Sequence, residues 1–137
     1  MKAQVYYCTK TKHTKAIAEA VAKGAGTTAV NIKSGEKPEN ADILFVGGSL
    51  YAGKIDRELR EFILSLKSGE VKRAVLFGSA ASGDTPFPEM RSLFEGKGIE
   101  VGKETFFCPG SFLFLRRGRP NEEDLAAACA FGKKAVE

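Results

Sequence analysis

The chain has 137 residues, which suits a single domain that buries about two-thirds of its unfolded surface around one core. Its hydrophobic fraction of 43% and charged fraction of 28% are ordinary for a globular protein, and no apolar run reaches the ~20 residues of a membrane span. The net charge of +4 permits an acidic partner. The basic residues are spread along the chain and do not alternate with aromatic residues, so we expect no nucleic-acid binding.

The cysteines and the N-terminus bear on the cellular compartment. Cys8, Cys108 and Cys129 are odd in number and form no CxxC pair, which argues against a disulfide framework and against a zinc site. Only Lys2 precedes the first apolar stretch, so no signal peptide is visible. We therefore expect a cytoplasmic protein with reduced thiols.

Strand-like and helix-like segments alternate in chain order. Apolar, β-forming runs predict strands at residues 3–8, 27–32, 42–47, 71–77 and 99–108. The first helix is predicted at 15–23, ended by Gly24 and Gly26, and Asn121 is predicted to cap the last helix. The apolar faces predicted for the four helices are Ile17, Ala20, Val21 and Gly24, then Ile55, Leu59, Phe62, Ile63 and Leu66, then Met90, Leu93 and Phe94, and finally Leu125, Ala128, Cys129, Gly132 and Val136.

This alternation predicts a parallel sheet with helices on both faces. The run 42–47 is almost continuously apolar, as expected of a strand that is covered on both sides. No linker, repeat or low-complexity segment interrupts the pattern, so residues 1–137 are predicted to form one domain.

The loop after the first strand carries the clearest chemical signal. Thr9-Lys10-Thr11-Lys12-His13-Thr14 brings three hydroxyls and backbone N–H groups to the N-terminus of a helix. Such donors at the positive end of a helix dipole predict an anion site. In a parallel sheet, ligands bind at this edge.

Other phosphate-binding motifs are absent. The segment Gly48–Lys54 fits Gly-x4-Gly-Lys, but Ile55 follows where a Walker A loop needs Ser or Thr, which excludes that loop. The segment Gly24–Ala29 fits GxGxxA, but it follows a helix and precedes a strand, so we interpret it as a helix stop. A phosphatase of similar architecture needs Arg six residues after Cys8, where Thr14 stands, and a response-regulator receiver needs Asp where Gly47-Gly48-Ser49 ends the third strand.

The chain resembles the flavodoxin family, element for element along essentially its whole length. The stretch Val5–Ala18 is similar to the family's signature of an apolar-aromatic strand, a T-x-T-x-x-T loop and an Ala-rich helix. The resemblance implies a flavodoxin-like three-layer α/β sandwich with a five-stranded parallel sheet of order 2-1-3-4-5 and helices on both faces. It also implies FMN as the cofactor, and the last strand resembles that of the short-chain form.

By this resemblance, three loops hold FMN. The loop Thr9–Thr14 would bind the phosphate, chiefly through its threonines. The loop Ser49–Gly53 would flank the isoalloxazine, with Tyr51 near the ring, and Ser79–Gly83 takes the remaining flavin-contacting position. The implied cofactor-binding residues are Thr9, Lys10, Thr11, Lys12, His13, Thr14, Ser49, Leu50, Tyr51, Ala52, Gly53, Ser79, Ala80, Ala81, Ser82 and Gly83, and no catalytic or metal-binding residue is assigned.

The sequence departs from the family pattern in two places. Lys12 stands where the family commonly has Gly, so the loop backbone has less conformational freedom. The third loop lacks the aromatic residue that stacks on the outer flavin face in electron-transfer flavodoxins. This second departure leaves room for a substrate.

Simpler interpretations stand beside these assignments. Thr14 can be read as a helix N-cap, and Tyr51 as a packed surface residue. His13 has no apparent acid partner, so we interpret it as a loop residue rather than a base. Cys8 is interpreted as a buried strand-end residue, although its place before a helix N-terminus favours a lowered pKa.

Two further segments stay open between alternatives. The apolar run Phe112–Leu115 is either core or a surface that meets a membrane or a partner, and the cluster Arg116–Arg119 is either a solvated loop or a docking patch.

Three functions remain. The leading one is an FMN-binding redox protein that passes electrons to or from a partner protein with an acidic docking surface. Lys10, Lys12, Lys15 and Lys54 fall near the site, and their positive charge is expected to favour the anionic, fully reduced flavin. The second is an FMN-dependent oxidoreductase acting on a small molecule, similar to flavodoxin-type protoporphyrinogen oxidases or to quinone reductases. The third is a flavodoxin-shaped interaction module without a cofactor.

Overall fold

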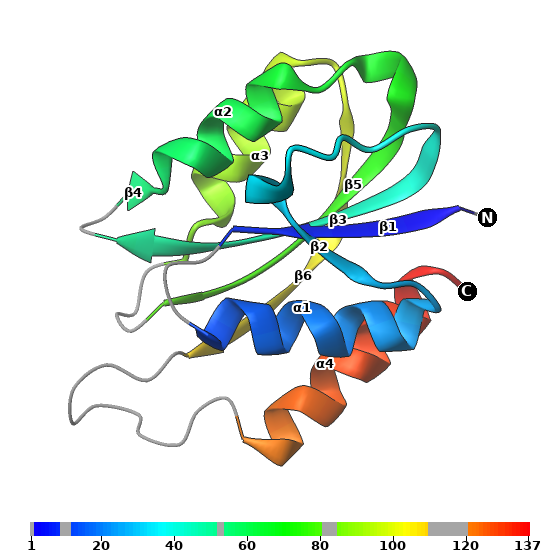
Figure 1. Cartoon of the computed structure of the whole chain (residues 1–137), viewed down its shortest axis with the longest axis vertical. Helices are drawn as coiled ribbons and strands as arrows, with labels where there is room; N and C mark the ends of the chain where they lie inside the picture. The colour runs from blue at the N-terminus through cyan, green and yellow to red at the C-terminus, as the bar shows by residue number, and fades with distance from the viewer. Residues whose placement is uncertain (1, 9–11, 52–53, 81–84, 110–120) are drawn as a thin grey trace.

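The chain folds into three layers in the computed structural model, which describes residues 2–8, 12–51, 54–80, 85–109 and 121–137. The parallel strands run in the order β2-β1-β3-β5-β6, with α1 and α4 on one face and α2 and α3 on the other (Figure 1). The described elements are β1 (Ala3–Tyr7), α1 (Lys12–Ala25), β2 (Ala29–Asn31), the 3-10 turn η1 (Ile32–Ser34), β3 (Ala41–Tyr51), β4 (Lys54–Ile55), α2 (Arg57–Ser65), the 3-10 turn η2 (Ser68–Glu70), β5 (Val71–Ala80), α3 (Phe87–Gly96), β6 (Glu100–Pro109) and α4 (Glu122–Ala135).

The predicted five-stranded parallel sheet of order 2-1-3-4-5 is confirmed, since β5 and β6 are its fourth and fifth parallel strands. Strand β4 is an addition, a short segment that pairs antiparallel with the end of β3. None of the described helices is long and apolar enough to cross a membrane.

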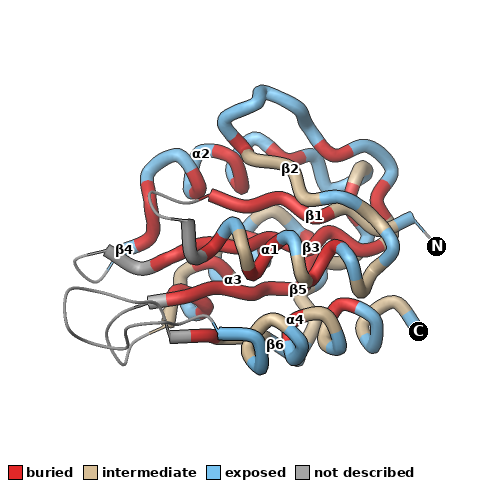
Figure 2. The backbone as a smooth tube through the Cα atoms, turned by 60° about the horizontal axis from the view of Figure 1, so that its bottom comes forward, coloured by how far each residue is buried: buried red, intermediate tan, exposed pale blue. Residues whose placement is uncertain are grey.

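Both faces of the central strands are buried. Alternate residues point to opposite sides, so that Leu44 and Val46 face α2 and α3 while Ile43 and Phe45 face α1 and α4. Figure 2 shows β1, β3 and β5 buried along most of their length. This is why the sequence of β3 reads as a continuous apolar run.

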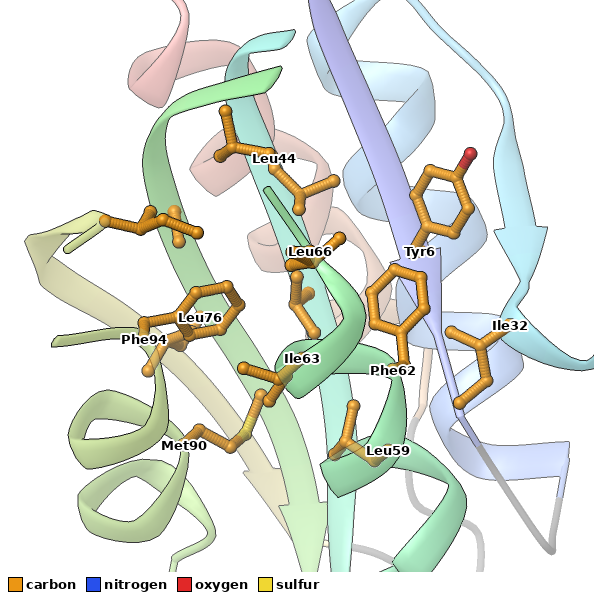
Figure 3. Close-up of a cluster of buried hydrophobic side chains, with 14 of the residues drawn as sticks. Tyr6, Ile32, Leu44, Leu59, Phe62, Ile63, Leu66, Leu76, Met90 and Phe94 are labelled. Carbon is orange, nitrogen blue, oxygen red and sulfur yellow. The ribbon is translucent and has the colours of Figure 1, made fainter. Parts of the chain in front are cut away.

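The face under α2 and α3 confirms the predicted helical stripes. Leu59, Phe62 and Ile63 pack beside Met90 and Phe94 in one cluster against the sheet (Figure 3). Ile55 is buried as expected but lies in β4, ahead of α2.

On the face covered by α1 and α4, the predicted cap of α4 is confirmed, but its apolar contacts differ from the prediction. Asn121 caps α4 in a reciprocal capping box with Asp124, as its position suggested. The ring of Phe131, absent from the predicted apolar face, lies 6.3 Å from that of Phe45 and 5.7 Å from that of Phe106, measured between centroids. Phe131 thus contacts the sheet, whereas Cys129 and Gly132 of the predicted face contact the backbone of α1.

Glycines bring α1 and α4 together. The prediction that Gly24 ends α1 is wrong, because the helix continues to Ala25 and stops at Gly26, whose φ is +79°. A Cβ atom on Gly24 would overlap the carbonyl oxygen of Cys129, and one on Gly132 would overlap that of Val21. At each of the two contacts a glycine of one helix lies directly against the backbone of the other helix.

Replacing Gly24 with Ala should force these backbones apart. We expect Gly24→Ala to lower the free energy of unfolding by about 1–3 kcal/mol, as overpacking usually does. Gly96→Ala is the matched control, because Gly96 also lies in a helix but has open space around it. The control should be neutral or more stable by up to about 1 kcal/mol. Urea unfolding of both variants measures this, and equal stabilities would contradict the close contact.

Candidate functional site

The carboxyl ends of three neighbouring strands meet the N-terminus of α1. Tyr7 of β1 is in register with Gly47 of β3, and the backbone N–H of Cys8 donates to the carbonyl of Gly47 at 3.0 Å. Further along, Ser49 of β3 is in register with Ser79 of β5. The chain therefore leaves β1, β3 and β5 at the same edge of the sheet, as the parallel arrangement predicted.

Three buried hydroxyls join these segments. Thr14 Oγ1 lies 2.6 Å from Ser49 Oγ and 3.0 Å from Ser79 Oγ, and the two serine oxygens are 3.1 Å apart. The exposed fractions of Thr14, Ser49 and Ser79 are 0%, 6% and 3%. We call this closed set of contacts the hydroxyl ring, and it connects residues up to 65 positions apart in the chain.

The N-terminus of α1 carries no acidic residue in its first turn, in contrast to α2, α3 and α4. An acid at that position stabilises a helix by complementing its dipole. Because α1 has no such acid, the positive end of its dipole can interact with a bound anion. Thr14, the third residue of the helix, lies at this end. Hydroxyl donors and a helix N-terminus together fit a phosphate monoester.

The structure brings Thr14, Ser49 and Ser79 together, three of the residues that the sequence proposed for the site. Lys12 and His13 open α1, Leu50 and Tyr51 end β3, and Ala80 ends β5. The remaining proposed residues lie outside the described part of the chain, namely Thr9, Lys10, Thr11, Ala52, Gly53, Ala81, Ser82 and Gly83. The segments Phe112–Leu115 and Arg116–Arg119 also lie outside it.

The second loop is a β-hairpin, which the sequence analysis missed. Leu50 pairs with Ile55 and Tyr51 with Lys54, so residues 52–53 connect two antiparallel strands. The backbone N–H of Ile55 donates to Glu89 Oε1 of α3 at 3.2 Å. The sequence does contain a signal for this hairpin. Ala52-Gly53 follows an apolar strand and precedes Lys54-Ile55, and two-residue hairpin turns favour glycine.

Cys8 lies beside the site but is held as a thiol. Its side chain is buried, and burial together with the negative charges of Asp56 and Glu58 raises its pKa to about 12. Asp56 caps α2 by accepting the backbone N–H of Glu58 at 2.8 Å. The interpretation of Cys8 as a buried strand-end residue is confirmed, and the alternative of a lowered pKa is wrong because desolvation outweighs the lowering effects of Lys33 and of the backbone hydrogen bond from Leu59.

Cys8 should therefore react slowly with thiol reagents. With a pKa of about 12, only about one Cys8 in ten thousand is a thiolate at pH 8. We expect an alkylating reagent to label Cys129, which is half-buried, in the native protein, while Cys8 and the buried Cys108 react only after unfolding. Mass spectrometry of the labelled peptides measures this. Labelling of Cys8 at the rate of Cys129 would contradict the assignment.

Metal chemistry finds no support in the described part of the chain. No group of three or more His, Cys, Asp or Glu side chains in those residues could hold a metal ion. The chemistry that the described site offers is the binding of an anionic group at a helix N-terminus.

Comparison with known proteins agrees with this geometry. A family model described as a flavodoxin domain matches residues 4–104. An archaeal flavodoxin superposes with a TM-score of 0.81 at 19% identity, over 99% of this chain and 96% of that chain. Oxidised Flavodoxin 1 from Bacillus cereus superposes with a TM-score of 0.76 at 17% identity, over 99% and 97%.

A larger protein contains the same fold. A flavodiiron core from Synechocystis superposes with a TM-score of 0.73 at 15% identity over 99% of this chain, which spans only 35% of that core. No curated protein sequence matches the chain.

Proposed function

Because this chain belongs to the flavodoxin family, we propose that it carries electrons to or from a partner protein on FMN held at the carboxyl ends of β1, β3 and β5. FMN is the cofactor of this family. When bound, it supplies the electron-transfer chemistry, while the chain supplies binding, orientation and charge. The observation that carries the proposal is the hydroxyl ring at the N-terminus of α1.

The phosphate of FMN would be held by this end of the site. Thr14 supplies a hydroxyl donor, the first turn of α1 supplies backbone N–H groups, and Thr9 and Thr11 of the preceding loop extend the set by sequence. The isoalloxazine would lie between the hairpin around residues 51–53 and the loop at 80–83. Glu89 supports that hairpin through Ile55, so the flavin-flanking segment is anchored to α3.

The partner protein is proposed to present an acidic surface. Lys15 in the first turn of α1 and Lys54 in β4 are exposed at the proposed flavin end, and the chain carries a net charge of +4. Opposite charge steers the approach of two proteins and raises their association rate. Association with the partner should accordingly weaken as ionic strength rises.

A second candidate is an FMN-dependent oxidoreductase with its own small-molecule substrate. It is favoured by the segment Ser79–Asp84, which contains no aromatic residue to cover the outer face of the flavin. Turnover of a porphyrinogen or a quinone by the purified FMN-loaded protein, without a partner protein, would distinguish this candidate from an electron carrier.

FMN binding is the first test. We expect the purified protein to retain about one equivalent of FMN after the excess is removed, seen as flavin absorption in the visible range. Thr14→Ala should weaken FMN about 10- to 100-fold, as expected for one lost charge-assisted hydrogen bond. Thr28→Ala, at an exposed threonine outside the site, should leave the affinity unchanged. A folded protein that retains no FMN would leave the interaction module as the surviving alternative.

Positive charge at the flavin end should ease full reduction of the cofactor. Lys54→Glu is expected to lower the second one-electron reduction potential by on the order of 10–40 mV, because the fully reduced flavin is anionic. Lys67→Glu makes the same change of charge at an exposed lysine before β5, at the amino end of the sheet, and should have no such effect. A redox titration of both variants gives the result, and equal shifts would argue against a local role for Lys54.

A further inference from the structure

The hydroxyl ring uses every hydroxyl proton that it contains. A Ser or Thr hydroxyl has one proton to donate and two lone pairs that accept. The three mutual contacts of 2.6, 3.0 and 3.1 Å therefore engage the protons of Thr14, Ser49 and Ser79, one each. In this closed state no proton of the ring remains for an anion.

Phosphate binding requires the ring to open at one contact. Thr14 lies in the first turn of α1, where the helix dipole and backbone N–H groups favour an anion, so its proton is the one that turns to a phosphate oxygen. The Thr14 oxygen then accepts from Ser49 and from Ser79, both already within hydrogen-bond distance. All three protons are again engaged, two by Thr14 and one by the phosphate, so opening costs no hydrogen bond.

We infer that Ser79 serves the empty site, by closing the ring and satisfying the hydroxyls of Thr14 and Ser49 until a phosphate arrives. This inference rests on the proposed function, because it takes the phosphate of FMN as the anion. Without the Ser79 hydroxyl, Thr14 and Ser49 share a single hydrogen bond, and within the described part of the chain the other buried proton has no acceptor. Such a group destabilises the folded state.

If Ser79 has this role, its hydroxyl affects the stability of the ligand-free protein but is not needed for FMN binding. The unsatisfied proton of a Ser79→Ala variant exists only in the empty protein, since bound phosphate accepts it. The variant should therefore lose stability without ligand, while its affinity for FMN stays the same or increases. Loss of Thr14 removes the donor itself, so Thr14→Ala should lose affinity for FMN and not for riboflavin, which lacks the phosphate.

The experiment measures thermal unfolding of the ligand-free protein and fluorescence titrations with FMN and riboflavin. For Ser79→Ala we expect the melting temperature to fall by about 3–8 °C and the Kd for FMN to equal the wild-type value or be up to about 10-fold tighter. For Thr14→Ala we expect a Kd for FMN about 10- to 100-fold weaker. Riboflavin should bind both variants as it binds the wild type. Ser68→Ala, at an exposed serine, is the control that changes neither quantity.

Two results would overturn the inference while FMN binding stays intact. If Ser79→Ala weakens FMN as much as Thr14→Ala does, Ser79 is itself a phosphate ligand. If Ser79→Ala changes neither the melting temperature nor the Kd, the ring contributes nothing. Should Ser79→Ala fail to fold, Ser79→Cys keeps a weaker donor and is measured in the same way, with a smaller loss of melting temperature expected. A wild-type protein that binds no FMN would instead contradict the proposed function.

Discussion

The arrangement of the site depends on hydrogen bonds among three hydroxyls that are distant in the sequence. Thr14 of α1, Ser49 of β3 and Ser79 of β5 are buried within 2.6–3.1 Å of one another. Buried hydroxyls without partners cost free energy, so these three residues stabilise the fold only while the three segments stay together. The same contacts set the starting points of the loops after β3 and β5 relative to the helix that follows β1. The proposed phosphate site thereby rests directly on the buried core.

The sheet provides the rigid base that this arrangement needs. Its central strands are covered on both faces, and their parallel register aligns Ser49 with Ser79. On one side α1 is held against α4 by backbone contacts at Gly24 and Gly132, which fixes the helix that presents Thr14. On the other side Glu89 of α3 holds the hairpin through Ile55. Each layer therefore positions one part of the proposed FMN site.

Much of this could be predicted from the sequence, because strands and helices leave regular apolar patterns along the chain. The five parallel strands and the apolar stripe of α2 were predicted for that reason. The cap at Asn121 was predicted from the capping preference of Asn and the acidic residues that follow it. The contact of Gly24 with Cys129, the role of Phe131 and the anchoring of the hairpin by Glu89 were not, because each joins segments far apart in the sequence. Cys8 was correctly expected to be buried, but the alternative of a lowered pKa was wrong because the charges of Asp56 and Glu58 come near it only in the folded chain. Thr14, Ser49 and Ser79 were each proposed for the site from the sequence, but their hydrogen bonds to one another could not be predicted.

Crystal structures of the protein without ligand and with FMN would test the central claim most directly. The account predicts that the ligand-free structure contains all three contacts of the hydroxyl ring. With FMN, it predicts a phosphate oxygen about 2.5–3.0 Å from Thr14 Oγ1 at the N-terminus of α1, with Ser49 and Ser79 still bonded to Thr14. A phosphate bound away from α1, or a closed ring that does not touch it, would contradict the account.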